Sequence, residues 1–328
     1  MEANASHPFA TLGPERVLDA IDATGLLTDG RLLALGSYEN RVYQAGLDAG
    51  GFIVAKFYRP ERWSDEAILE EHAFTCMLAE AEIPAVPPIV LPDGGTLAHH
   101  DGFRLAIFER RGGRSPELDD PAVLSWIGRF IGRIHGAGQA MPFSHRLTLD
   151  VQTWGELPSA VVLASSHLPA DLRDAYALAV QKALDGVRQS FERAGSVSSI
   201  SLHGDCHPGN VLWTDAGPHF VDFDDACTGP AVQDLWMLLS GERADMTRQL
   251  ADLASGYEDF AEFNPREAGL IEALRTLRMI HYAAWLARRW DDPAFPVTFP
   301  WFNTRGWWEE HVGNLRDQVA RMAEPWYF

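Results

Sequence analysis

An α+β fold is predicted, with a strand-rich first part of residues 1–110 and a larger, mainly helical part of residues 111–328. In the first part, short apolar runs alternate with turns rich in Gly and Asp, a pattern typical of antiparallel hairpins. In the second part, apolar residues recur at helical spacing over long stretches. The polar, glycine-rich segment Glu109–Arg114 lies between the two patterns. Such segments are common at domain boundaries.

The first part should form an antiparallel sheet and one helix. The turn Asp48–Gly51 separates two apolar runs and therefore predicts a hairpin. Ser64 is a suitable helix N-cap because the acidic residues Asp65 and Glu66 follow it, and Pro84 is expected to lie just beyond the helix end. We expect strands at residues 32–35, 41–45, 52–58, 96–98 and 103–108.

The second part should be helical except for one region of short strands and loops at residues 200–225. Gly128, Gly132 and Gly136 recur every four residues in its first helix. This spacing puts the three glycines on one helix face and predicts close packing against a second helix. We expect helices at residues 121–138, 169–194, 235–239, 271–290 and 307–322.

The charge balance excludes several classes of partner. The chain has 27 Lys and Arg against 46 Asp and Glu, a net charge of −19. Binding to nucleic acid or to an anionic membrane surface needs clustered basic residues, so neither partner is expected. No apolar run approaches the roughly 20 residues that span a bilayer.

The cysteines and the N-terminus indicate a reducing compartment. The three cysteines lack C-x-x-C spacing, which disfavours a disulfide framework or a cysteine zinc site. The N-terminal residues show neither the basic nor the apolar region of a secretory signal. We therefore expect a cytoplasmic protein, and we expect it to be a monomer.

One lysine stands out because lysine is rare in this chain. Among the 27 basic residues only Lys56 and Lys182 are lysines. Lys56 lies within the apolar run Phe52–Tyr58, where a surface residue is not expected. Neither lysine follows a glycine, which excludes a Walker A loop. We infer that Lys56 is present because a function requires its ammonium group.

The region between residues 200 and 225 contains a pattern suited to phosphoryl transfer. An apolar run leads into H-G-D-x-x-x-x-N at residues 203–210, and a second leads into D-F-D-D at residues 222–225. Phosphoryl transfer depends mainly on positioning and charge neutralisation. Asp205 could supply the carboxylate that faces an acceptor hydroxyl. Asn210 and Asp222 offer hard oxygen ligands, which Mg²⁺ prefers.

These two motifs resemble the aminoglycoside-phosphotransferase-like branch of the protein-kinase-like fold. The resemblance implies a bilobal fold with a small β-rich N-terminal lobe and a larger helical C-terminal lobe. It implies that Asp205 is the catalytic base, that Asn210 and Asp222 hold Mg²⁺, and that ATP is the co-substrate. Protein kinases carry H-R-D and D-F-G at these motifs. Gly204 and Asp224 therefore favour the phosphotransferase-like branch.

The resemblance extends upstream of the two motifs. It implies that Lys56 binds the nucleotide phosphates and that Glu71 orients this lysine, with Glu70 as an alternative. It also implies that the turn Gly36–Asn40 covers the phosphates, where Ser37 is the residue best suited to donate a hydrogen bond.

Further residues follow from the same resemblance. The segment Glu109–Gly112 would meet the adenine through its backbone, and Asp234 would brace the catalytic loop. His203 would support that loop. Asp224 either contacts a second metal ion or lies in a solvated turn.

A closer resemblance is to the bacterial stress response kinase family, carried by residues 37–43, 56–63, 229–239 and 290–301. It implies a cytoplasmic, Mg²⁺-dependent serine/threonine protein kinase that acts on protein hydroxyls and could phosphorylate itself. Two alternatives remain. One is a kinase acting on an amino alcohol, a sugar or an aminoglycoside. The other is a non-catalytic nucleotide-binding scaffold.

Several of these residues also fit other roles. His203, Asp205 and His207 alternate like metal ligands, but a zinc site needs more donors in a closing geometry. Cys206 is interpreted as a small buried residue, with a redox-active thiol as the alternative. The arginines of the helix at residues 271–290, Arg278 among them, could contact an acidic or phosphorylated acceptor.

Overall fold

A computed structural model describes residues 7–326 as two compact units. Within the described residues, the first unit comprises the chain up to Pro116 together with Phe143–Arg146 and Gly209–Asp224. The second unit comprises Glu117–Pro142, Leu147–Pro208 and the chain from Asp225 onward. Two short segments from later in the sequence therefore pack with the N-terminal part. Residues 1–6, which contributed to the expected localisation, lie outside the described residues.

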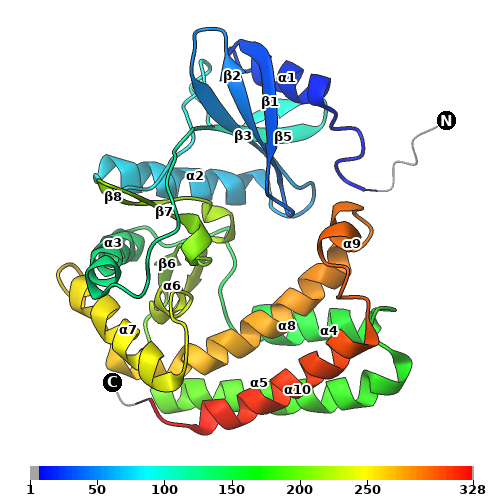
Figure 1. Ribbon diagram of the computed structural model, residues 1–328, viewed down its shortest axis with the longest axis vertical. Coiled ribbons are helices and arrows are strands. Elements are labelled where there is room, and N and C mark those ends of the chain that lie inside the picture. Colours follow the sequence, from blue (N-terminus) through cyan, green and yellow to red (C-terminus); the bar gives the residue numbers. More distant parts are fainter. Residues whose placement is uncertain (1–6, 327–328) are drawn as a thin grey trace. The chain divides into compact units, whose positions relative to one another are not determined.

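The first unit is built on a five-stranded antiparallel sheet in the order β1-β2-β3-β5-β4 (Figure 1). Its strands are β1 (Thr28–Leu35), β2 (Arg41–Leu47), β3 (Phe52–Tyr58), β4 (Ala98–His100) and β5 (Phe103–Glu109). Lys56 of the central strand β3 pairs with Val42 on one side and Ala106 on the other. The five predicted strands are present, but β1 begins at Thr28 and not at residue 32, and β4 spans Ala98–His100 and not residues 96–98.

Two helices of the first unit pack on the sheet. Because side chains alternate along a strand, Ala55 and Phe57 face away from Lys56. These two residues pack in a core with Val17 and Ile21 of α1 (Pro14–Asp22), a helix that the sequence analysis did not predict. The predicted helix α2 (Asp65–Glu80) begins after Ser64, whose side chain accepts a hydrogen bond from the Ala67 N–H, so the predicted cap is confirmed.

A hairpin from the middle of the sequence completes the first unit. Strands β7 (Val211–Thr214) and β8 (Gly217–Phe220) pair antiparallel. The Phe220 N–H donates to the Pro84 carbonyl and the Phe220 carbonyl accepts from the Val86 N–H, at 2.8 and 3.1 Å. These bonds join the hairpin to the segment that follows α2. They place Asn210 and Asp222, at the two ends of the hairpin, in the same unit as Lys56.

The second unit is mainly helical. It contains the two-stranded sheet of β6 (Ile200–Leu202) and β9 (Cys227–Gly229). Its α-helices are α3 (Pro121–Ala140), α4 (Leu157–Ala164), α5 (Arg173–Ala194), α6 (Val232–Trp236), α7 (Arg243–Tyr257), α8 (Ile271–Arg289), α9 (Ala294–Thr298) and α10 (Arg305–Ala323). The helix predicted at residues 235–239 lies three residues earlier, as α6, and α4, α7 and α9 were not predicted. None of the helices in residues 7–326 is long and apolar enough to cross a membrane.

The predicted glycine packing is confirmed for two of the three glycines. Helix α3 lies beside α7 (Figure 1). A Cβ atom on Gly128 would lie 2.0 Å from the Leu253 carbonyl oxygen, and one on Gly132 would lie 2.6 Å from that of Tyr257. A Cβ on Gly136 would meet nothing within 4 Å, so the prediction for Gly136 is wrong. The close approach of α3 and α7 depends on Gly128 and Gly132.

His311 of α10 lies in an aromatic cluster of the second unit. Its ring stacks on Trp307 and Tyr176, with centroid distances of 4.9 and 6.0 Å. Burial lowers the pKa of His311 to about 4. The ring is therefore neutral at pH 7 and would have to leave the cluster to take up a proton freely.

We predict that Gly128→Ala destabilises the second unit while Gly136→Ala does not. The added methyl of Gly128→Ala must push apart two helix backbones, which should cost about 1–3 kcal/mol of unfolding free energy. Gly136→Ala should stabilise the helix by up to about 1 kcal/mol because alanine has the higher helix propensity. Urea unfolding of both variants measures this. Equal stabilities for the two would contradict the packing described above.

Acidification should destabilise the protein through His311. Its pKa lies below the value near 6.5 of an unfolded chain, so the stabilisation is present above about pH 6.5 and is lost as pH falls toward 4. His311→Phe keeps an aromatic ring but cannot titrate. Between pH 7 and 5 this variant should lose about 2 kcal/mol less unfolding free energy than the parent protein. Urea unfolding at both pH values checks this, and identical pH dependences would refute it.

Candidate active site

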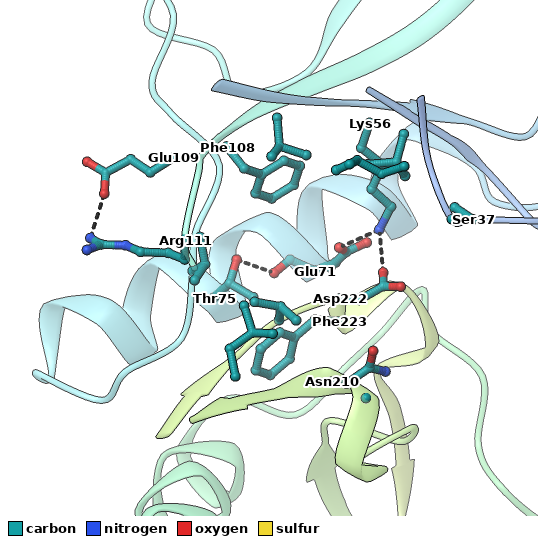
Figure 2. Close-up of a pocket in the computed structure, with 18 residues that line it drawn as sticks. Ser37, Lys56, Glu71, Thr75, Phe108, Glu109, Arg111, Asn210, Asp222 and Phe223 are labelled. Carbon is teal, nitrogen blue, oxygen red and sulfur yellow. Dashed lines mark hydrogen bonds and ion pairs between the residues drawn. The ribbon is translucent and has the colours of Figure 1, made fainter. Parts of the chain in front are cut away.

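A cavity of about 440 Å³ in the first unit contains most of the predicted site residues (Figure 2). Apolar walls separate a charged end, where Lys56, Glu71 and Asp222 lie together, from the ion pair of Glu109 and Arg111 at the other end (Figure 2). The apolar lining includes Val42, Val54, Val86, Phe108, Leu212 and Val221, and the polar lining includes Ser37, Lys56, Glu71, Asn210 and Asp222. The cavity therefore suits a ligand with a flat apolar portion and an anionic end.

The Lys56 ammonium lies at the charged end, surrounded by three carboxylates. Its Nζ lies 3.4 Å from Oε1 of Glu71, 3.1 Å from Oδ1 of Asp222 and 3.0 Å from Oδ1 of Asp224. The residue is 5% exposed. Figure 2 shows Lys56 reaching from β3 toward Glu71 of α2 and toward Asp222. Lys56, Glu71 and Asp222, predicted from distant parts of the sequence, are brought together.

Arginines balance the carboxylates of this cluster. Arg62 forms an ion pair with Asp224 and lies 3.7 Å from Glu39, which also pairs with Arg59 at 3.1 Å. Arg146 lies 3.8 Å from Oε2 of Glu71. The cluster thus contains the acids Glu39, Glu71, Asp222 and Asp224 and the bases Lys56, Arg59, Arg62 and Arg146. Because buried charges are costly unless they are paired, this balance is what allows Lys56 to remain charged.

The pKa shifts follow from burial opposed by charge. Burial alone would lower the pKa of Lys56, but Asp224, Glu71 and Asp222 outweigh it and hold the pKa well above its usual value. Burial would raise the pKa of Asp224, but Arg62, Lys56 and Arg146 lower it. Lys56 therefore remains an ammonium and Asp224 a carboxylate. Both oxygens of Asp224 contact basic groups, which favours a role as a counter-ion over a solvated turn.

The alternatives Glu70 and Glu71 have different partners. Glu71 is the residue that pairs with Lys56. The Glu70 carboxylate accepts hydrogen bonds from the backbone N–H groups of Ser144, His145 and Arg146, at 2.6, 2.8 and 3.0 Å. Glu70 therefore anchors the Phe143–Arg146 segment to α2.

Arg146 joins that segment to the cluster. It donates to the carbonyl oxygens of Ala67, at 3.3 Å, and of Asp224. Its guanidinium lies 4.1 Å from the centre of the Trp63 ring. Arg146 was not predicted from the sequence, because its partner Asp224 is 78 residues away and no spacing pattern marks it. A buried arginine in a loop is visible only in the folded chain.

The metal ligands inferred from the sequence fit a magnesium ion. Asn210 and Asp222 both line the cavity, and the Asp222 side chain is 52% exposed. Asp222 adopts a left-handed backbone conformation with φ +60°, which is unusual for a residue other than glycine and is often found at functional positions. Mg²⁺ is commonly held by one or two carboxylates plus substrate phosphates. The donor set fits such an ion.

The turn at residues 36–40 is held from outside the cavity. Asn40 Oδ1 accepts from the Arg59 N–H at 3.0 Å, and the Arg59 guanidinium donates to the carbonyls of Glu39 and Tyr38 at 2.8 and 3.1 Å. Ser37 lines the cavity at the start of this turn. At the other end, Glu109 and Arg111 of the predicted hinge also line it and form an ion pair of 2.5 Å.

The second unit contains the other predicted residues, Asp205, His203 and Asp234. The Asp234 carboxylate accepts from the backbone N–H groups of His203 and Gly204, at 2.9 and 2.8 Å. It also contacts His135 at 3.0 Å. Gly204 has φ +83°, and a Cβ there would lie 2.1 Å from the Asp225 carbonyl oxygen. Asp234 thus holds the backbone of a turn that only glycine can form.

The Asp205 carboxylate is surrounded by basic groups of its own unit. Its Oδ1 lies 2.7 Å from Nη1 of Arg278, and its Oδ2 lies 3.5 Å from Nε2 of His207. Burial would raise the pKa of Asp205, but Arg278, His207 and His203 together lower it. Asp205 is therefore ionised at neutral pH and able to accept a hydrogen bond from a hydroxyl.

Two of the alternative readings are disfavoured. In the part of the chain that the structure describes, no group of three or more His, Cys, Asp or Glu is arranged to hold a metal ion, which disfavours the zinc reading of His203, Asp205 and His207. Cys206 is fully buried, and burial raises the pKa of its thiol well above the usual value. This favours a small buried residue over a reactive thiol.

Comparisons with known proteins show which family the chain resembles. Residues 31–271 match the "Phosphotransferase enzyme family". The chain is 42% identical to "Stress response kinase A" of Escherichia coli strain K12 over 322 residues, covering 98% of this chain and 97% of that protein. It is 41% identical to "Serine/threonine protein kinase RdoA" of Salmonella typhimurium strain LT2, covering 97% of this chain and 95% of that one.

The fold is shared with solved structures of lower identity. The amicoumacin kinase hAmiN, solved in complex with AMP-PNP, Ca²⁺ and Ami, superposes with a TM-score of 0.73 at 17% identity and covers 94% of this chain and 93% of its own. The predicted kinase-like α+β fold is confirmed. The chain belongs to the phosphotransferase enzyme family and, within it, to the group that includes stress response kinase A.

Proposed function

We propose that this protein is a cytoplasmic, ATP- and Mg²⁺-dependent kinase that transfers the γ-phosphate to serine or threonine hydroxyls of proteins in a bacterial stress response. The observation that carries the proposal is the Lys56 ammonium, buried at the charged end of the cavity and paired with Glu71 and Asp222. Phosphoryl-transfer sites need such a fixed cation to position and neutralise the phosphates.

Each predicted residue then has a defined part. Lys56, oriented by Glu71, binds the α- and β-phosphates, and Ser37 donates to a phosphate from the covering turn. Asn210 and Asp222 hold Mg²⁺, which neutralises charge on the phosphates when it is bound. Asp205 accepts the hydrogen bond of the acceptor hydroxyl and orients it. Asp234 and His203 keep the backbone around Asp205 in place.

The protein acceptor is proposed from the relatives. The Salmonella relative carries the name of a serine/threonine protein kinase and is aligned along 97% of this chain. A second candidate is a small-molecule kinase, which is supported by the fold shared with the amicoumacin kinase at 17% identity. The greater identity to the first group favours the protein acceptor.

We predict that purified protein given radiolabelled ATP and Mg²⁺ labels a generic protein substrate or itself, and that Asp205→Ala abolishes the label. Loss of the hydroxyl-orienting carboxylate should reduce the rate by about 10²-fold or more. A panel of amino alcohols, sugars and aminoglycosides is offered in parallel. Label only in a small molecule would overturn the protein acceptor, and nucleotide binding without transfer to any acceptor would favour a scaffold.

We predict that Glu71→Gln impairs ATP use while Glu70→Gln impairs stability. Glu71→Gln removes the charge that fixes Lys56, and kcat/KM for ATP should fall about 10- to 100-fold. Glu70→Gln leaves Lys56 paired but replaces an acceptor of three backbone N–H groups, so the unfolding free energy should fall by about 1–3 kcal/mol. Steady-state kinetics and urea unfolding of this matched pair check the assignment, and the reverse pattern would contradict it.

A further inference from the structure

Arg278 has no part in the roles assigned so far, although it is the strongest contact of Asp205. Its guanidinium reaches Asp205 from α8 at 2.7 Å, and its side chain is 35% exposed. Arg278, His207 and His203 are basic groups that lower the pKa of Asp205, and only Arg278 among them carries a permanent charge. Arg278 is therefore the fixed positive charge beside this carboxylate, in a chain whose net charge is −19 with histidine counted as neutral.

Arg278 is also distinct from the other arginine nearby on its helix. Arg275, about one turn earlier, pairs with the buried Glu272 at 3.5 Å and is thereby engaged in the interior. Arg278 instead faces the carboxylate that the proposed reaction uses. When an acceptor hydroxyl forms a hydrogen bond with Asp205, it shares that carboxylate with Arg278, whose remaining N–H donors can bind a second anion at the same time.

An exposed aromatic surface continues along the same side of α8. Tyr282 lies one turn after Arg278 and is 37% exposed. Its ring stacks on Trp285 and on Trp301, with centroid distances of 5.5 and 6.4 Å. Trp301 is itself 38% exposed. Arg278 with Tyr282 and Trp301 therefore presents a cation beside rigid aromatic rings, a combination typical of surfaces that bind peptides.

We propose that Arg278 selects the acceptor by charge, so that the hydroxyl phosphorylated lies in an acidic peptide segment that packs on Tyr282 and Trp301. This proposal rests on the proposed function and specifies its substrate class. An acidic side chain near the hydroxyl gives the partly exposed Arg278 guanidinium a second anionic partner beside Asp205. A basic side chain, or a cationic small molecule, meets a like charge there and is disfavoured.

The test compares two serine peptides that differ only in flanking residues, glutamate in one and lysine in the other. The parent protein should show a kcat/KM about tenfold higher for the acidic peptide, mainly through KM. Arg278→Ala should bring the ratio of the two peptides close to one, Arg278→Glu should invert it, and Arg278→Lys should retain part of it. Arg288→Ala, which removes an equal charge from an exposed position further along α8, should keep the ratio of the parent protein.

The ratio separates selection from a structural role. If Arg278 only anchors α8 to the loop of Asp205, Arg278→Ala will reduce kcat/KM for both peptides by the same factor. This result would overturn the proposal. A parent protein without preference, or one that prefers the basic peptide, would overturn it as well.

The outcome is also separable from that of the proposed function. If small molecules are labelled but no peptide or protein is, the proposal of a protein acceptor is wrong. The ratio of kcat/KM values is then measured for an anionic and a cationic hydroxyl compound. Preference for the anionic compound that disappears in Arg278→Ala would support charge selection by Arg278. Preference for the cationic one, or absence of transfer to every acceptor, would contradict it.

Discussion

A lysine ammonium buried inside a protein costs several kcal/mol unless carboxylates surround it, and this requirement organises the first unit. Lys56 comes from the central strand, Glu71 from α2, and Asp222 and Asp224 from the segment after the β7–β8 hairpin. If one of these elements moved away, the buried Lys56 ammonium would lose a carboxylate partner. The cluster therefore explains why residues 209–224 pack with an N-terminal sheet from which they are distant in sequence.

The same requirement explains the arginines around the cluster. Three carboxylates on one ammonium would repel one another, and Arg62 and Arg146 supply the missing positive charge. Arg146 is delivered by a short segment that Glu70 holds through three backbone hydrogen bonds. The adjacent acids of α2 thus have different roles. Glu71 pairs with Lys56, and Glu70 holds the segment that carries Arg146. A cation held this firmly keeps its position and its charge, so only its contact with Asp222 has to be exchanged when an anionic ligand binds.

Residues marked by local spacing or by rarity could be predicted from the sequence. Asp205, Asn210 and Asp222 lie in short motifs, and Lys56 is one of two lysines in the chain. Arg146 could not be predicted because its role depends on partners that only folding brings near it. Helix α7 was missed although Met246, Leu250, Leu253 and Tyr257 recur at helical spacing along its buried face, a pattern that predicts a helix. The bounds of β4 were predicted wrongly because this strand has only three residues. Its position depends on pairing with β5 and not on the strand propensity of its own residues.

The most direct test of this account is an experimental structure of the protein with Mg²⁺ and a non-hydrolysable ATP analogue. The account predicts that Lys56 keeps Glu71, exchanges Asp222 for phosphate oxygens, and leaves Asp222 and Asn210 as ligands of the metal ion. The adenine should lie between the apolar residues that line the cavity. A nucleotide bound elsewhere, or phosphates that make no contact with Lys56 while Asp222 remains paired with it, would contradict the central role of the buried lysine.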